Sequence, residues 1–165
     1  MLFAVATVVA LWLQTEVRLW LPPGALFPNL VLILVVDLGL KQHSGLAPAL
    51  AFAMGYATDA CAGTHLGLNA FMMTLIFLLS YELSRHVWVT GRVIGPVTVA
   101  LADLLNTLGT MAITGGVASV SGIKAPALRM VVLEALITAA VAPLIFAALD
   151  AGKRALRLPV RVAAE

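Results

Sequence analysis

The stretch that decides the fold runs from Gly45 to Ala70 and reads GLAPALAFAMGYATDACAGTHLGLNA. It is apolar, it carries small residues at every fourth position, and its one acid is Asp59. Positions 47, 51, 55, 59 and 63 fall on one ridge of a helix, because residues four apart share a helix face. A neighbouring helix can approach such a ridge closely and give the acid a partner. We therefore predict that this ridge packs against another helix, of this chain or of a partner protein.

The composition indicates a membrane protein. Hydrophobic residues make up 62% of the 165-residue chain and charged residues 11%, whereas soluble domains have about 25% charged residues. A chain of this length could not bury so much apolar surface in water. The single cysteine, Cys61, excludes an internal disulfide, and no Cys/His set has the spacing of zinc ligands. We expect no metal and no cofactor.

Six hydrophobic segments approach the ~20 residues that a bilayer-spanning helix needs, and short connections with proline or glycine separate them. The sequence therefore predicts an all-α membrane protein, a compact single-domain bundle of six transmembrane helices with short loops. The predicted spans are about 1–21, 27–40, 45–62, 66–84, 93–115 and 126–149, with a basic tail over 150–165.

The basic residues predict the orientation. Lys and Arg gather on the cytoplasmic side of membrane proteins, and the alternate sides of the six-span arrangement hold seven and three of them. We therefore expect both termini in the cytoplasm. The seven are Lys41, Arg85, Arg92, Lys153, Arg154, Arg157 and Arg161, and the three are Arg18, Lys124 and Arg129.

The last four basic residues of the seven belong to the predicted tail. Near an anionic leaflet each such charge contributes about 1 kcal/mol of membrane attachment. Lys153, Arg154, Arg157 and Arg161 are therefore expected to contact lipid, or alternatively a cytoplasmic partner.

Four acids lie within or at the edge of the predicted spans: Asp37, Asp59, Asp103 and Glu134. Because an ionised carboxylate at the bilayer centre costs on the order of 3 kcal/mol, each is expected to be paired, protonated or at a wet site. Asp37 lies four residues before Lys41, a spacing that favours an ion pair within one helix.

Asp103 begins a polar stripe on an otherwise apolar segment, and Glu134 shares a helix face with Thr138. Such stripes face protein or water rather than lipid, so these groups either join helices by hydrogen bonds or form a ligand or proton site. The stripe continues through Asn106, Thr107, Thr110 and Thr114.

Enzyme motifs are absent from the sequence. It has no Gly-x-Ser-x-Gly, no His-Glu-x-x-His and no phosphate-binding loop. We therefore expect no catalytic residue, although an intramembrane enzyme can draw its catalytic groups from distant helices.

Residues 51–70 read small-Phe-x-x-Gly-x-x-x-Asp-x-x-x-Gly-x-x-Leu-Gly-x-x-Ala. This pattern resembles the core signature of MreD, the rod-shape-determining membrane protein family. The resemblance covers about residues 10–85, because LWLQT at 11–15, the proline-led PNLVLIL at 28–34 and the basic link KQH at 41–43 stand in the same order. Ala51 stands where a glycine is common in the family, and Asn29 where an acid is often seen.

The resemblance implies a non-catalytic scaffold of the bacterial cell-elongation (rod) complex in the inner membrane. Such a protein binds the bitopic protein MreC and helps to couple the RodA/penicillin-binding-protein synthase pair to MreB, which maintains cell shape. The positions that match the family motif are Ala51, Gly55, Asp59, Gly63 and Gly67.

Other functions fit the same bundle. MreD is similar in size, span count and small-residue content to the solute-binding S component of energy-coupling-factor vitamin importers, whose fold the bundle is expected to share. In that alternative a solute pocket would be lined by Asp59, His65, Asp103, Asn106 and Glu134. The short outer segments, poor in aromatic and polar groups, argue against a vitamin site. A channel or proton-coupled carrier would instead need the four acids to line one path.

Overall fold

The computed structural model describes residues 2–20, 27–41, 45–63, 67–86, 94–115 and 125–155. This part of the chain is all-helical, with six helices and no strand, and each helix overlaps one of the six segments that the sequence predicted. The helices are α1 (Leu2–Trp20), α2 (Leu30–Lys41), α3 (Ala47–Ala62), α4 (Leu68–His86), α5 (Ile94–Gly115) and α7 (Ala125–Ala155).

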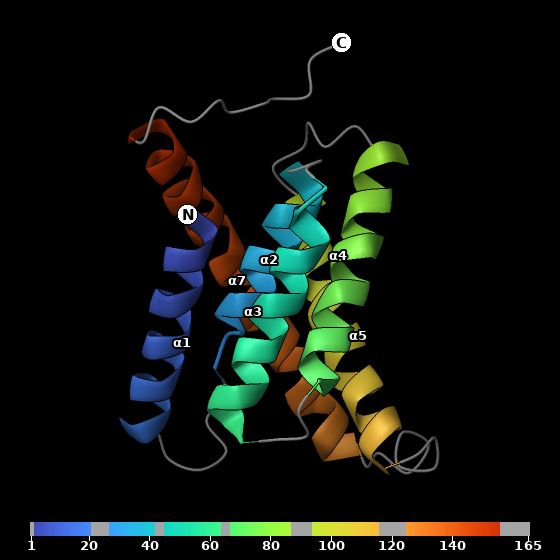
Figure 1. Cartoon of the computed structure of the whole chain (residues 1–165). Coiled ribbons are helices and arrows are strands. Elements are labelled where there is room, and N and C mark those ends of the chain that lie inside the picture. The colour runs from blue at the N-terminus through green and yellow to red at the C-terminus, as the bar shows by residue number, and fades with distance from the viewer. Residues whose placement is uncertain are drawn as a thin grey trace.

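Successive helices run in opposite directions, so that the start of α1 and the end of α7 lie at the same end of the bundle (Figure 1). α3 packs along α4, and α5 packs along α7. α2 contacts α1, α3, α4, α5 and α7 and therefore occupies the centre.

The central helix α2 is buried along nearly its whole length. Residues 31–40 are all buried, and apart from Asp37 this segment is apolar on every side. Its 12 residues give a helix about 18 Å long, well short of the ~30 Å hydrocarbon core of a bilayer. α2 is thus the core helix of the bundle.

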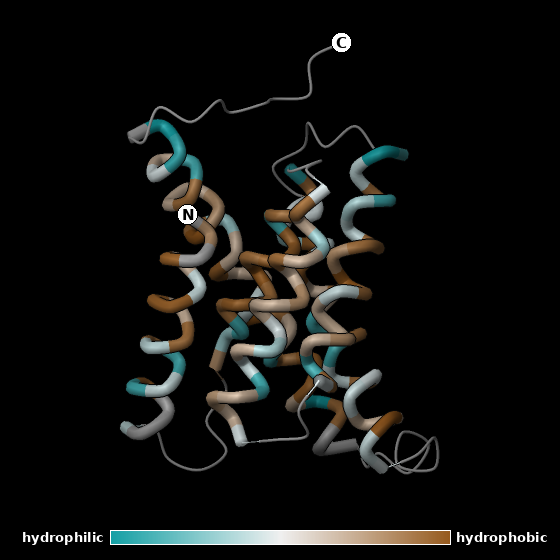
Figure 2. Tube along the Cα trace, in the orientation of Figure 1, coloured by the Kyte–Doolittle hydropathy of each residue, from teal (hydrophilic) through white to brown (hydrophobic). Residues whose placement is uncertain are grey.

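Two helices are long and apolar enough to cross a membrane: α5 over Ile94–Gly115 and α7 over Leu128–Arg154. Their apolar side chains remain largely on the outside, as Leu101 and Leu144 show with 62% and 71% of their surface exposed. In Figure 2 hydrophobic residues run along the middle of the helices, and hydrophilic ones gather toward the ends of α4 and α7. Large apolar side chains therefore lie on the outside of both helices.

The last helix is longer than the sequence predicted. α7 continues to Ala155, past the expected end at 149, so residues 150–155 do not belong to a tail. Asp150 and Lys153 lie on its final turns, and both bond to residues of α2. These ion pairs attach the last turns of α7 to α2, so the helix continues past its apolar residues.

We predict that Gly39→Ala destabilises the bundle. A Cβ at Gly39 would lie 2.8 Å from Cβ of Ser80 and 2.9 Å from the backbone oxygen of Phe77, so α2 and α4 would have to separate. Overpacking of this kind costs about 1–3 kcal/mol. The matched control is Gly45→Ala, because a Cβ at Gly45 meets nothing within 4 Å. Thermal unfolding of the two purified variants should show a loss only at Gly39, and equal melting temperatures would contradict this packing.

Candidate functional site

The carboxylate of Asp59, fully buried near the end of α3, caps the first turn of α4. Its Oδ2 accepts hydrogen bonds from the backbone N–H of Gly67 at 2.9 Å and of Ala70 at 3.2 Å. Its Oδ1 accepts from the backbone N–H of Asn69 at 3.2 Å and from the Asn69 side-chain amide at 2.9 Å. The first N–H groups of a helix have no partner within the helix, and the positive end of the helix dipole favours a negative charge there. Asp59 therefore joins two helices by satisfying the free donors of the second.

Gly55 lies one turn before Asp59 and brings the two helices into backbone contact. A Cβ on Gly55 would lie 2.6 Å from both Cα of Ala70 and the backbone oxygen of Asn69. Ala51, fully buried, continues the same ridge. The predicted ridge thus lies against α4 of this chain, and its small residues allow Asp59 to reach the α4 backbone.

Two glycines complete this arrangement at the ends of the helices. Gly63 ends α3 with a left-handed φ of 63°, and its N–H donates to the backbone oxygen of Asp59 at 3.1 Å. Gly67 precedes α4 with a φ of 96°. Side chains other than hydrogen rarely tolerate these values. The five motif residues therefore form one structural unit, which we call the Asp59 clasp: Ala51, Gly55, Asp59, Gly63 and Gly67.

The flank of α3 next to the clasp is exposed. Phe52 and Tyr56 are about half exposed, and their rings stack with centroids 6.5 Å apart. The motif side chains are thus used within the bundle, whereas this aromatic pair is exposed on its outside.

A second polar group joins α5 to α7. Asp103 is buried, and its Oδ2 accepts a hydrogen bond from the hydroxyl of Thr138 at 2.9 Å. The same hydroxyl lies 2.9 Å from the backbone oxygen of Glu134, and its oxygen accepts from the N–H of Asn29 at 3.4 Å. Asn29 also caps α2, because its Oδ1 accepts from the N–H of Leu32. The group therefore connects the middle of α5 and α7 to the start of the core helix.

The rest of the predicted polar stripe divides along α5. Asn106 is buried, whereas Thr114 is exposed and donates to the backbone oxygen of Thr110. Glu134 on α7 is half-buried. Asp103 and Asn106 are thus the buried part of the stripe, and Thr107 and Thr110 are half-buried.

The third polar group is a cluster of four charges between α2 and α7. Asp37 is fully buried and pairs with Lys41 at 2.7 Å and with Lys153 at 3.0 Å. Lys41 also pairs with Asp150 at 2.9 Å. The predicted pair of Asp37 with Lys41 is present, and α7 adds the other two charges. Two acids and two lysines leave the cluster neutral, which makes the burial of Asp37 tolerable.

Lys153 corrects a sequence prediction. It was expected to contact lipid from a free tail, yet it is buried, bonded to Asp37, and its ammonium lies 5.1 Å from the ring centroid of Phe3. The Asp37 carboxylate supplies the negative charge that a lipid headgroup was expected to supply. Arg154 is exposed, and Arg157 and Arg161 lie outside the described residues.

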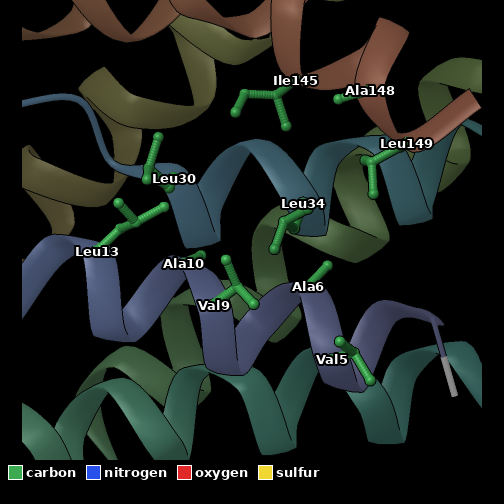
Figure 3. A pocket seen from close by; sticks show the side chains of 10 residues that line it. All are labelled: Val5, Ala6, Val9, Ala10, Leu13, Leu30, Leu34, Ile145, Ala148 and Leu149. Carbon is green, nitrogen blue, oxygen red and sulfur yellow. The ribbon is translucent and has the colours of Figure 1, made fainter. Parts of the chain in front are cut away.

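An apolar groove of about 300 Å³ runs between α1, α2 and α7 (Figure 3). Its lining is entirely aliphatic, so it offers no group that would orient a polar solute. The lining residues are Val5, Ala6, Val9, Ala10, Leu13, Leu30, Leu34, Ile145, Ala148 and Leu149.

The residues proposed to line a vitamin pocket are not brought together in the described part of the chain. Asp59 is bonded to α4, whereas Asp103 is bonded to α7, and His65 lies outside the described residues. In the same ranges no group of three His, Cys, Asp or Glu residues could hold a metal ion.

No protein-family model, no curated protein and no solved structure matches this chain. Its function is therefore inferred from its own residues and their arrangement.

We predict a graded loss of stability at Asp59. Asp59→Asn keeps one acceptor oxygen but turns an amide N–H₂ toward backbone donors, whereas Asp59→Leu leaves all of them unsatisfied. Each buried unsatisfied donor costs about 1–3 kcal/mol, so the leucine variant should have a much lower free energy of unfolding than the asparagine variant. Asn69→Ala, which removes only the side-chain amide bond, is the mild control. Equal unfolding free energies for Asn and Leu variants would contradict the capping role.

We also predict that Lys153→Met destabilises the protein by about 1–3 kcal/mol, because it removes one charged partner from the buried Asp37. Arg154→Met, one residue further along and exposed, should change stability by less than ~0.5 kcal/mol. Thermal unfolding of both variants is the measurement. Similar stabilities would show that the charge cluster does not hold α7 to α2.

Proposed function

We propose that this protein is a non-catalytic scaffold of the bacterial cytoplasmic membrane, of the MreD type. In this role it binds MreC and helps to couple the RodA/penicillin-binding-protein synthase pair to MreB during cell elongation. The observation that carries the proposal is the Asp59 clasp. The residues by which the sequence resembles MreD act together in one helix pair, as a family-defining structural element would.

The distribution of apolar and basic residues supports a multi-pass position in the membrane. α5 and α7 are each long enough to span a membrane. The other helices pack antiparallel in the same bundle, so they would lie in the membrane as well. The short helix α2 is compatible with this arrangement, because it is enclosed by other helices and its ends need not face lipid.

The proposed orientation places both termini in the cytoplasm. Lys41, Arg85, Lys153 and Arg154 lie on the last turns of α2, α4 and α7, at the end of the bundle that holds Leu2 and Ala155 (Figure 1). Lys and Arg near helix ends favour the cytoplasmic side.

The proposed contact surface for MreC is the uncovered face of α3. Phe52 and Tyr56 supply large, rigid side chains, and α1 lies beside α3 with Val8 and Trp12 exposed. The membrane segment of a bitopic protein is a single helix, which can bury one apolar face against such a surface. Aromatic anchors of this kind carry much of the energy at protein interfaces.

The S-component alternative has weaker support. Its pocket would need polar groups converging on a solute, whereas the groove in Figure 3 is aliphatic and the Asp59 carboxylate is occupied by the α4 backbone. No observation in the described part of the chain favours solute binding over partner binding at α3.

The test is copurification of the tagged protein with MreC from bacterial membranes, together with rescue of rod shape in cells depleted of MreD. We expect the wild type to capture MreC. The double variant Phe52→Ala/Tyr56→Ala should capture at least tenfold less MreC and keep the melting temperature of the wild type. Phe71→Ala on α4, equally exposed, is the matched control and should bind normally. Failure of the wild type to capture MreC would overturn the proposal, and copurification with an ATPase and a transporter subunit would indicate the importer.

A further inference from the structure

Three aspartates are buried in the described part of the chain, and their environments differ. Asp37 is neutralised by Lys41 and Lys153. Asp59 accepts four hydrogen bonds from the start of α4. Asp103, only 3% exposed, has one described partner, the neutral hydroxyl of Thr138. Of the three carboxylates, Asp103 alone has neither a counter-charge nor a full set of donors among the described residues.

The single bond to Asp103 is itself shared. A hydroxyl has one proton, and Thr138 Oγ1 lies 2.9 Å from both Asp103 Oδ2 and the backbone oxygen of Glu134. When the proton turns toward Glu134, no described group donates to Asp103. A buried carboxylate in this position has to be neutralised, either by a bound cation or by a proton.

An independent observation points to the same place. Asn106 lies three residues after Asp103 on the same face of α5 and is 9% exposed. Its Oδ1 is buried and accepts no hydrogen bond from any described residue. A buried amide oxygen without a donor is costly, and Asn106 lacks a described donor directly beside Asp103, whose one described donor is shared.

We propose that Asp103 and Asn106, with the hydroxyl oxygen of Thr138, bind one monovalent cation of the charge and size of Na⁺. The ligands are a carboxylate, an amide and a hydroxyl oxygen, the donor type that hard cations take. One carboxylate balances one positive charge. Transition metals are a poor match, because no group of three His, Cys, Asp or Glu residues in the described ranges could hold a metal. A bound cation would join α5 to α7 at the level where Asn29 starts the core helix.

The test uses the full-length protein in lipid nanodiscs, with thermal unfolding measured in NaCl, KCl and choline chloride at one ionic strength. Because a ligand that binds only the folded state stabilises it by mass action, the wild type should melt at progressively higher temperature as Na⁺ replaces choline. Radioactive ²²Na⁺ should bind once per chain. Asp103→Asn and Asn106→Leu should abolish both effects.

The control variant is Asp37→Asn, which alters a buried aspartate that is already paired with lysines. It should lower the melting temperature in every salt and retain the response to Na⁺. The inference is overturned if choline stabilises as well as Na⁺, or if Asp103→Asn still responds to Na⁺. It is also overturned if wild-type stability follows pH but not Na⁺, because Asp103 is then neutralised by a proton. These outcomes are independent of whether the protein captures MreC.

Discussion

The contact on which the bundle depends is the one between Asp59 and the first turn of α4. The first N–H groups of any helix have no hydrogen-bond partner within that helix, and away from water they need an acceptor from another part of the protein. Asp59 supplies both oxygens to those groups, and Gly55 removes the side chain that would keep α4 at a distance. The two features require each other. Without the close approach of α4, the Asp59 carboxylate would be a buried charge with no hydrogen-bond donors. Without the carboxylate, the close approach would bury backbone N–H groups of α4 that have no acceptor.

The other polar groups extend the same constraint around the core helix. α2 is apolar apart from Asp37 and Lys41, so its described polar contacts lie toward its two ends. Asn29 and Thr138 hold the start, and the four-charge cluster with Asp150 and Lys153 holds the end. Hydrophobic burial alone would allow α2 to slide or rotate among its neighbours, whereas paired polar groups at both ends give it one register.

The outer surface of the bundle is where the proposed scaffold would act. Asp59, Asp103 and the four-charge cluster bond to other polar side chains or to backbone, and the aliphatic groove beside α1 offers no orienting group for a polar substrate. What remains available is an apolar exterior with stacked aromatic rings on α3. An apolar surface of this kind is what the scaffold proposed above would use for association within the membrane.

Local sequence patterns determined the six helices, the small-residue ridge and the pairing of Asp37 with Lys41, because hydrophobic runs and spacings of three or four residues fix what happens within one helix. They also showed that Asp59 needs a partner. They could not show that the partner is the α4 backbone, that Lys153 leaves the tail to reach Asp37, or that Asp103 meets Thr138. Each of these contacts joins residues of different helices, and their geometry depends on how the helices pack. The burial of the short helix α2 was decided in the same way, since an apolar segment can face lipid or protein equally well until its neighbours enclose it.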